Sequence, residues 1–566
     1  MKRKVGRSRL PVEKSERSAR AVGTATTTTA GLEVRTETNG TRVARQSLTA
    51  SMVLVGSNLV STVFLAITAL TIARLLGPTA YGEYALALVL PEAFMLFSGL
   101  GMNTALTRYS AYHISRMEVA VARRKSRSAA TMLLINGATV GAVNLFAASF
   151  FCAVLFHRPE LTSIVRLASI AILGQAMLQA STAGFIGWGS TGLAGLASAS
   201  QALVKLLLSP LLILLGFSVY GAVLAYSVSF LSAGIVFLLV FYSRNLRGMM
   251  GGGRRIVDDV KEFFSYGLPE YAGRVLFLFS QQSYLLIVLG AITTNVTVAY
   301  YQAATNVATN LWMAPWAIMQ ALLPGFARLD GAGGDLRSAF NHAQKYSSFV
   351  VTPIVFYILG ASSLVTNALY GQAYLGSSTY LQLLCVGYLP FALGLSVLPP
   401  LLNGLGRTKL TLSMYLASST VLIVLAPILG VFLQLKVIGL MIAWIVSNVV
   451  QLAAGMVLAT RVGVRFRYHA AFRSFLAAGA SYAGIWLAIE AGLGTYQTLA
   501  VSMAAYLLLY LTLAPVLRVM ERGEFLQLME LSRGTGLLGR ALSFVLRYEI
   551  YVAGVATANA RRLTRR

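Results

Sequence analysis

Four ionisable residues lie deep inside long apolar stretches of this 566-residue chain: Glu92, Lys205, Glu270 and Arg274. A charged side chain at the centre of a membrane-spanning helix costs about 2.5–3.5 kcal/mol on insertion scales, so such residues usually have a function. Arg274 could bind a diphosphate through its planar fork of N–H donors, and Lys205 could do so as a point charge. Glu92 or Glu270 could take up a proton and couple the movement of a solute to an ion gradient.

The same four residues also allow a purely structural interpretation. Glu270 and Arg274 are four residues apart, so they would share one helical face and could pair with each other. Lys205 could pair with Glu92 and thereby fix the packing of neighbouring helices. Neutral polar side chains in other apolar stretches could either line a polar path or hold helices together by hydrogen bonds. They are Asn58, Gln281, Gln282 and Asn306.

The sequence predicts no catalytic residue, no metal site and no cofactor. Cys152 and Cys385 both lie within apolar runs, where a cysteine behaves as a small core residue. The four histidines are scattered, without the spacing of a metal site. The stretch 534–539 matches a dinucleotide-binding pattern in letters only, because no strand precedes it. H⁺ or Na⁺ could still drive a transport step.

Composition and hydropathy place these residues in an all-α polytopic membrane protein. The chain is 57% hydrophobic and only 11% charged, with a mean hydropathy of +0.70, whereas a soluble domain has about 25% charged residues. It contains fourteen apolar segments, each near the roughly 20 residues that span a bilayer as a helix. They lie at about 51–75, 80–107, 129–156, 163–187, 192–216, 218–243, 263–290, 297–325, 346–369, 377–403, 410–433, 437–460, 471–490 and 495–517.

The formal net charge of +27 is distributed in a way that predicts the orientation of the chain in a cell membrane. If the N-terminus is cytoplasmic, most basic loop residues fall on the cytoplasmic side. Only Arg74, Arg158, Arg166 and Lys436 fall on the other side. This bias follows the positive-inside rule and predicts that both termini of this multi-pass protein are cytoplasmic. The charge therefore does not indicate a nucleic-acid partner.

An internal repeat predicts two related halves. The segment 187–229 recurs as 404–447: Gly187, Gly189, Thr191 and Pro210 match Gly404, Gly406, Thr408 and Pro427. Duplicated halves are common in secondary transporters, where the substrate site lies between them. The two prolines are expected to kink helices and so shape the halves.

These boundaries divide the chain into six parts. We predict a disordered basic cytoplasmic tail (1–46), a first lobe of six helices (47–243), a cytoplasmic linker (244–262), a second six-helix lobe (263–460), two further helices (461–517) and a cytoplasmic or interfacial C-terminal tail (518–566).

Two motifs carry a resemblance to a known family. The stretch Ala-Arg-Leu-Leu-Gly-Pro-Thr-Ala-Tyr-Gly-Glu-Tyr at 73–84 and Gly-Leu-Gly-Met-Asn-Thr-Ala-Leu-Thr-Arg at 99–108 resemble the signature of prokaryotic polysaccharide flippases of the Wzx/RfbX type. That family belongs to the multidrug/oligosaccharidyl-lipid/polysaccharide (MOP) exporter superfamily. The resemblance covers residues 50 to 517. It implies two six-helix lobes around a central cavity, two extra C-terminal helices, and a polysaccharide polymerase or glycosyltransferase as partner.

The resemblance also implies a function and shows one departure. It implies that the protein moves polyprenyl-phosphate-linked glycans from the inner to the outer leaflet of the bilayer. Relatives often carry an Asp-Arg pair late in the seventh segment, but Ser283 and Tyr284 stand there in this chain. No role of that pair can be transferred to this protein.

We therefore predict a flippase for lipid-linked oligosaccharide or polysaccharide precursors that works by alternating access and is not an enzyme. The first alternative is a MATE-like multidrug or cation antiporter, which should favour acidic and aromatic cavity residues over basic ones. The second is a non-transporting membrane scaffold or a membrane-embedded glycosyltransferase. A transferase would need acidic clusters in sizeable outer loops, and such loops hold few acids here. Arg274→Ala is expected to abolish glycan display.

Overall fold

The structure of the protein is a computed structural model. It describes the chain except for residues 1–25, 249–258, 260, 264–270, 272–281, 312, 332, 465, 467, 533–542 and 556–566. For 26–55, 282–283, 531–532 and scattered positions of α10 (Met313–Gly331), only the backbone is described.

All regular elements in the described ranges are helices, as predicted from the composition. Nine of these helical stretches are long and apolar enough to cross a membrane, or ten if one bent pair is counted as a span. Two of the nine, Gly56–Ser115 with 60 residues and Thr191–Leu246 with 56 residues, are far longer than the roughly 20 residues that one crossing needs. The chain is thus an all-helical, multi-pass membrane protein.

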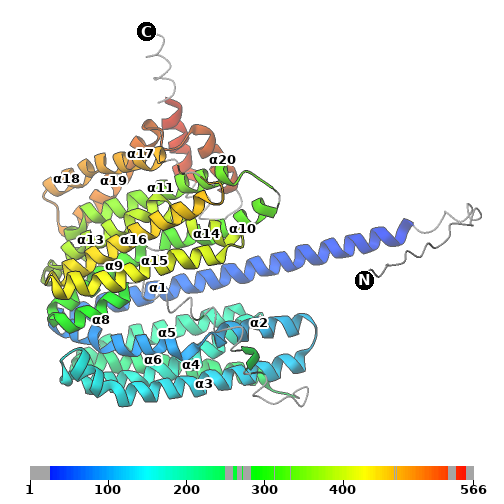
Figure 1. Cartoon of the computed structure of the whole chain (residues 1–566), viewed down its shortest axis with the longest axis vertical. Helices are drawn as coiled ribbons and strands as arrows, with labels where there is room; N and C mark the ends of the chain where they lie inside the picture. Colours follow the sequence, from blue (N-terminus) through cyan, green and yellow to red (C-terminus); the bar gives the residue numbers. More distant parts are fainter. Residues whose placement is uncertain are drawn as a thin grey trace, which may run out of the picture.

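The first group of helices comes from the N-terminal part of the chain and forms the blue to cyan layer of Figure 1. At its centre α4 packs against α3 and α6, mainly through small residues that let membrane helices approach closely. The helices of this group are α1 (Thr26–Gly99), α2 (Met102–Ser115), α3 (Val119–Phe150), α4 (Thr162–Gly187), α5 (Thr191–Leu212) and α6 (Ser218–Phe241).

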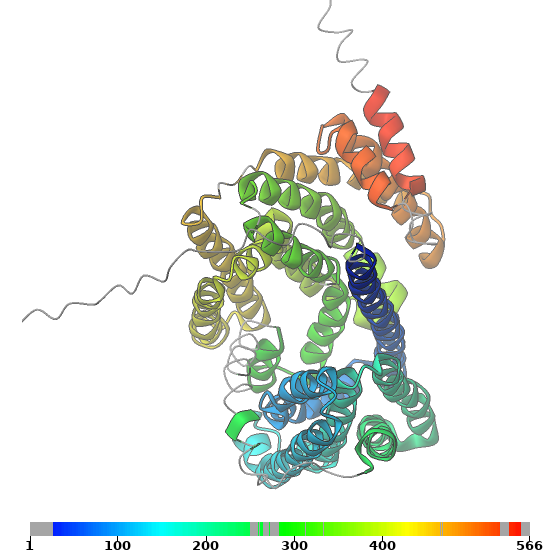
Figure 2. The ribbon, with the colours of Figure 1, turned by 90° about the vertical axis from the view of Figure 1, so that its right-hand side faces the viewer.

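The second group follows and forms the green to yellow layer. Its helices are α8 (Gln282–Ile292), α9 (Asn295–Leu311), α10 (Met313–Gly331), α11 (Leu336–Gly360), α12 (Ser362–Tyr370), α13 (Ser377–Pro390), α14 (Leu398–Gly404), α15 (Thr408–Pro427) and α16 (Lys436–Thr460). Figure 2 shows both groups nearly along their helix axes, with the C-terminal helices on the outside of the second group.

Two predicted spans are interrupted, which hydropathy alone does not reveal. The segment predicted at 346–369 bends by 74° between α11 and α12. The segment predicted at 377–403 breaks at Gly394, where φ is 121°. The break within α1, at Gly77 with a φ of 71°, falls between the first two predicted segments. Positive φ values suit glycine because it has no Cβ, so Gly77 and Gly394 allow these breaks.

The internal repeat shares several backbone features between its two copies. Gly189 and Gly406 have φ values of 76° and 69°, and each forms the short turn before a long helix. Those helices, α5 and α15, both carry a proline near the C-terminal end and continue into a π-helical turn, Ile213–Phe217 or Ile428–Phe432. The repeat in the sequence is therefore also a repeat in the structure.

The N-terminal boundary differs from the sequence-based expectation. Helix α1 begins at Thr26, within the tail predicted to be disordered up to residue 46. The helix therefore begins well before the first apolar segment, and it does so through a threonine-rich stretch with Gly31 and Gly40 that intrinsic helix propensity does not favour. Residues 1–25 lie outside the described residues.

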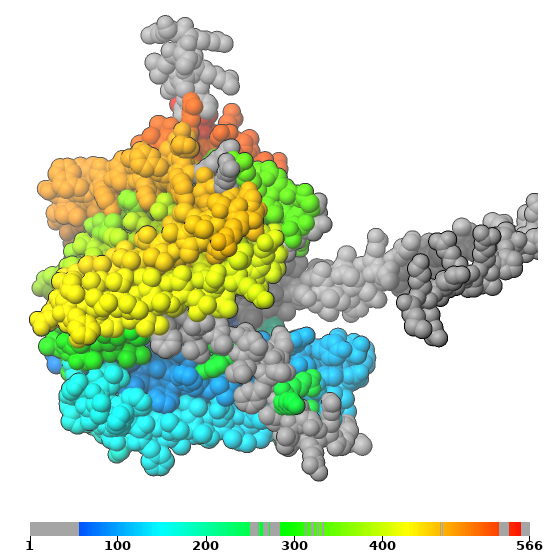
Figure 3. Space-filling model, in the orientation of Figure 1, coloured from blue at the N-terminus to red at the C-terminus, as the bar shows by residue number. Residues whose placement is uncertain are grey.

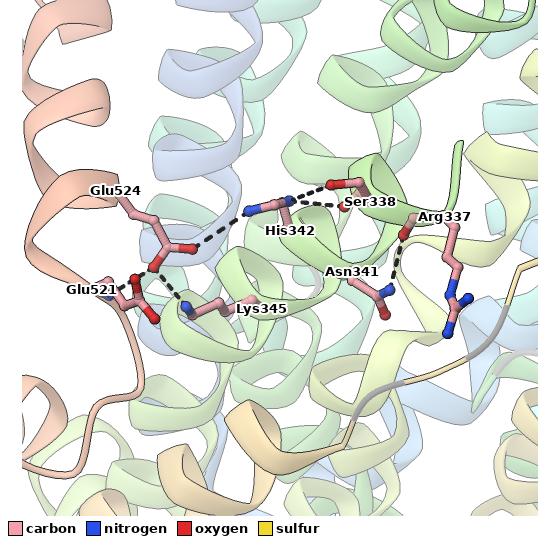
Figure 4. Close-up of polar contacts among 7 residues, drawn as sticks. All are labelled: Arg337, Ser338, Asn341, His342, Lys345, Glu521 and Glu524. Carbon is pink, nitrogen blue, oxygen red and sulfur yellow. Dashed lines mark hydrogen bonds and ion pairs between the residues drawn. The ribbon is translucent and has the colours of Figure 1, made fainter. Parts of the chain in front are cut away.

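The C-terminal part packs beside the second group. It contains α17 (His469–Ala480), α18 (Tyr482–Glu490), α19 (Thr495–Val516), α20 (Arg522–Ser532) and a last helix at 543–555. Figure 4 shows how α20 is held against α11 by one carboxylate. Glu524 accepts a hydrogen bond of 2.6 Å from Lys345 Nζ and one of 2.7 Å from the backbone N–H of Glu521, and it lies 3.8 Å from His342 Nε2.

Candidate functional site

Two cavities meet at the second half of α1. The first, of about 380 Å³, lies inside the first group of helices, and the second, of about 350 Å³, lies between α1, α8 and α9. Both volumes fall in the range of roughly 300–1,000 Å³ that is typical of small-ligand sites. Glu92 and Leu96 line both cavities, so these two residues mark the junction between them.

The first cavity contains a basic and an acidic side chain that do not pair. Lys205 on α5 and Glu92 on α1 both line it, yet neither forms an ion pair with any described side chain. Lys205 Nζ instead lies 4.8 Å from the ring centroid of Tyr226, within the range of a cation–π contact. The Lys205–Glu92 pair considered from the sequence is therefore not formed as a direct ion pair, although the two charges are near enough to interact electrostatically. Glu92 remains exposed to the cavity space.

Amide side chains form the rest of the polar lining of the first cavity. Gln175 and Gln179 are one turn apart on α4, so they project from the same face of that helix. Their side-chain oxygens are buried and have no hydrogen-bond partner in the described structure. Gln201 on α5 is satisfied, because its amide nitrogen donates a 3.0 Å hydrogen bond to Ser229 Oγ. The cavity thus offers one cation and at least two unoccupied acceptors.

The second cavity has a polar wall on α9, an apolar wall on α8, and a wall on α1 that is apolar except for Glu92. The polar wall is a face of α9 that carries Gln302, Thr305, Asn306 and Thr309. Gln302 Nε2 donates to Asn306 Oδ1 at 2.9 Å, and Asn306 Nδ2 donates to Tyr81 OH at 2.8 Å. The residues from α1 and α8 are Val89, Glu92, Ala93, Leu96, Leu286 and Ile287.

Arginine side chains join the two groups of helices at one end of the molecule. Arg158, in the turn between α3 and α4, donates to Asn295 Oδ1 and to the backbone oxygen of Thr293 in the turn between α8 and α9. Arg74 on α1 donates to the backbone oxygens of Leu369 and Ala368 at 2.6 and 2.5 Å. Figure 3 shows the α8–α9 turn, in green, in direct contact with the first group at this end.

Close backbone packing and aromatic side chains also hold the two groups of helices together at this end. A Cβ atom on Gly82 would lie 1.8 Å from the backbone oxygen of Asn295, so only glycine allows this approach. Tyr374 donates a 2.7 Å hydrogen bond to the backbone oxygen of Ala73, and its ring lies 6.1 Å from that of Tyr81. The two groups are therefore held together at this end by hydrogen bonds, ring contacts and backbone contact.

The structure places three of the sequence-derived candidates at the cavities. Glu92 and Lys205 line the first cavity, and Asn306 lines the second. Asn58 is exposed and lines neither of the two. Gln282 begins α8, but its side chain is not described. Gln281, Glu270 and Arg274 lie outside the described residues.

Other cavity residues were not identified from the sequence. These are Asn103, Gln175, Gln179, Gln201, Gln302, Thr305 and Thr309. A signal was present in two places: Gln175 and Gln179 have i, i+4 spacing, and the polar residues of α9 have i, i+3, i+4, i+7 spacing within apolar segments. Helical spacing predicts a shared face but not what that face contacts.

The family and the fold of the chain follow from comparison with known proteins. Groups of His, Cys, Asp and Glu that could hold a metal ion are absent from the part of the chain that the structure describes. The chain belongs to the polysaccharide biosynthesis protein family, whose model matches residues 47–330. Its fold is that of solved membrane transporters.

Comparison with solved structures supports the same fold. The lipid II flippase MurJ, in an inward closed conformation, superposes with a TM-score of 0.66 and 13% identity, covering 82% of this chain and 99% of that one. A mutant of the Vibrio cholerae MATE transporter VcmN gives a TM-score of 0.53 and 17% identity over 75% of this chain and 98% of that one. The MATE multidrug transporter DinF-BH gives a TM-score of 0.51 and 18% identity over 74% of this chain and 95% of that one. A search of curated protein sequences gave no match.

Proposed function

We propose that this protein moves lipid-linked oligosaccharide precursors of a polysaccharide from the inner to the outer leaflet of the cell membrane by alternating access. The observation that carries this proposal is the first cavity, where an unpaired lysine and free amide acceptors face a cavity inside a transporter fold. A phosphate-linked sugar cannot cross hydrocarbon unaided, because burial of its charge is too costly. Family membership and the fold shared with a lipid II flippase support the same substrate class.

We propose fourteen membrane spans with both termini in the cytoplasm. The stretch Gly56–Ser115 can supply two crossings that are separated at Gly77, and Thr191–Leu246 can supply two that are separated at Gly216, where φ is 92°. The distribution of basic loop residues supports this orientation. The joined end of the molecule, with Arg74 and Arg158, is then the extracytoplasmic end.

In this orientation the structure represents a state that is closed to the outside. The first cavity is lined at its other end by Gly101 and Asn103, near the α1–α2 turn, which is the cytoplasmic side in this orientation. The head group would enter from there, and its phosphates would contact Lys205. Release to the outer leaflet then requires that the contacts of Arg74, Arg158 and Gly82 separate.

Glu92 is proposed as the coupling residue. It is exposed at the junction of the two cavities, so a proton or cation bound there would change the charge that a passing head group meets. Entry of H⁺ or Na⁺ at this carboxylate could drive the return to the inward-facing state.

A multidrug or cation antiporter is the second candidate. Glu92 is an acid that lines both cavities, and Tyr226, Tyr271 and Tyr301 supply aromatic rings, which together suit an organic cation. Lys205 argues against it, because a fixed positive charge in the first cavity would repel such a substrate.

Leaflet-resolved measurement of lipid-linked glycan in a deletion strain tests the proposal. We expect the glycan to accumulate on the inner leaflet in cells that lack this protein and to appear outside when the gene is restored. Normal outer-leaflet glycan in the deletion strain, together with lost efflux of a cationic dye, would support the antiporter instead.

A further inference from the structure

The second cavity differs chemically from the first, although Glu92 lines both. Its polar wall on α9 presents two amides and two hydroxyls, and no described lysine or arginine lines it. A phosphate bound there would have no cation beside it, and would lie next to a carboxylate. The second cavity is therefore suited to an uncharged polar ligand.

The polar residues of α9 have the hydrogen-bonding capacity that hydroxyl-rich ligands require. Gln302 donates through its nitrogen to Asn306, which leaves its amide oxygen to accept. Thr309 donates a 2.7 Å hydrogen bond to the backbone oxygen of Thr305, so its own oxygen can still accept. Both side chains are at least partly exposed to the cavity. Sugar hydroxyls are donors that match these acceptors.

The walls on α1 and α8 suit the apolar faces of a sugar ring. Apart from Glu92, the residues that α1 and α8 contribute to the cavity are apolar: Val89, Ala93, Leu96, Leu286 and Ile287. The C–H faces of a pyranose are apolar and pack against such side chains, whereas its edge of hydroxyls makes hydrogen bonds. A polar wall on α9 and largely apolar walls on α1 and α8 thus match one ring held edge-on to α9.

We propose that the cavity between α1, α8 and α9 is a subsite for an uncharged sugar of the head group, with Gln302 and Thr309 as its hydrogen-bonding residues, while the first cavity takes the phosphates. The inference rests on the proposed function. It assigns separate recognition of charge and of sugar to two cavities that meet at Glu92.

The experiment compares binding of two probes to the full-length protein in lipid nanodiscs. One probe is farnesyl diphosphate, which carries the phosphates without a sugar. The other is the polyprenyl-linked glycan extracted from cells that lack this protein. The double variant Gln302→Leu/Thr309→Val removes the proposed acceptors and leaves Asn306 with its hydrogen bond to Tyr81 intact. Asn310→Leu is the matched control, because Asn310 is an exposed amide on α9 that does not line the cavity.

We expect the double variant to bind the glycan lipid about thirtyfold more weakly than the wild type, since each of the two lost hydrogen bonds contributes about 1 kcal/mol. Its affinity for farnesyl diphosphate should change less than twofold, which also shows that it is folded. Asn310→Leu should leave both affinities unchanged, and Lys205→Ala should weaken both. Equal weakening of both probes by the double variant, or no weakening, would overturn the subsite. A wild-type protein that binds neither probe would instead contradict the proposed function.

Discussion

At the scale of single residues, the unpaired state of Lys205 is the feature with the clearest chemical consequence. A lysine that has no carboxylate partner in a cavity keeps its three N–H donors available for a ligand. Its contact with the ring of Tyr226 orients the side chain without neutralising the charge. A diphosphate bound here would therefore require a positive charge at position 205, but not the particular shape of a lysine side chain.

Lys205→Ala is expected to lower glycan export at least tenfold, because a hydrogen bond to a charged group contributes about 1.5–3 kcal/mol. Lys205→Arg should retain most of the export, since it keeps the charge and can still stack on Tyr226. The measurement is the ratio of outer- to inner-leaflet lipid-linked glycan at equal protein levels. Similar export by Lys205→Ala and the wild type would show that this lysine does not bind the substrate.

At the scale of secondary-structure elements, the turns and helix ends carry the contacts that the proposed transport cycle would break. The turn between α3 and α4 meets the turn between α8 and α9, and the C-terminal end of α12 meets α1. These contacts are short-range and polar, so they can separate without unpacking either group of helices. On the opposite side of the second group, α20 is held to α11 by Glu524 (Figure 4).

Arg158→Ala is expected to favour the outward-open state. Loss of its hydrogen bonds to Thr293 and Asn295 removes about 1.5–3 kcal/mol per charged hydrogen bond, so the open population should rise tenfold or more. A cysteine at Thr305, which lines the second cavity, would report this opening. Its labelling by a membrane-impermeant maleimide added outside should increase severalfold in Arg158→Ala.

Arg166→Ala is the matched control for that measurement. Arg166 is an exposed arginine on α4 at the same end of the molecule, and no hydrogen bond joins it to the second group among the described residues. Its removal should leave labelling at the wild-type level. The same increase of labelling in both variants would indicate a general effect of losing a positive charge. It would show that the hydrogen bonds of Arg158 do not hold the two groups together.

The last helix, 543–555, is expected to detach as pH rises. Burial raises the pKa of Glu549 from about 4.5 to about 8, and neither carboxyl oxygen has a hydrogen-bond partner in the described structure. The docked helix therefore binds a proton that the undocked helix releases. Docking is strongest below about pH 4.5, weakens as pH rises from there to about 8, and is constant above that.

Hydrogen exchange of the amides at 543–555, corrected for the intrinsic pH dependence, measures this effect. Protection should be lower at pH 9 than at pH 6. Glu549→Gln should remove the difference, whereas Glu530→Gln, at an exposed position on α20, should not. Protection that does not change with pH in the wild type would contradict the prediction.

At the scale of the whole molecule, the two groups of helices are joined at one end and enclose two cavities. The joined end contains Arg74 and Arg158, two of the few basic loop residues predicted to face outside. The structural repeat gives each group a long helix that begins after a left-handed glycine. The same build in both groups is consistent with two lobes that rock against each other about the cavities.

Cysteine labelling on either side of α15 tests the proposed orientation. Leu433→Cys, after the helix, should react with an impermeant maleimide in intact cells, whereas Lys409→Cys, in its first turn, should react only after permeabilisation. Both positions are exposed, and the native Cys152 and Cys385 are buried and should contribute little background. The opposite pattern would reverse the orientation and place the joined end in the cytoplasm.

The sequence by itself determined the helical membrane class, the repeat and the positions of charge within apolar segments. These properties depend on each residue and its near neighbours, because the cost of placing a side chain in hydrocarbon is local. The glycine and proline pairs of the repeat could be matched for the same reason: each fixes a backbone turn within a few residues. The helical spacing of the α9 polar residues was also readable as a shared face.

Only the tertiary structure determined which residues of other elements those helix faces contact. Lys205 and Glu92 could equally have formed an ion pair, and which of the two arrangements occurs depends on how α1 and α5 are rotated against each other. Arg74 hydrogen-bonds a backbone oxygen 295 residues away in the sequence, and no local pattern marks that partner. Cavities and closures arise from packing between distant segments, and packing depends on shape complementarity that hydropathy and periodicity do not encode.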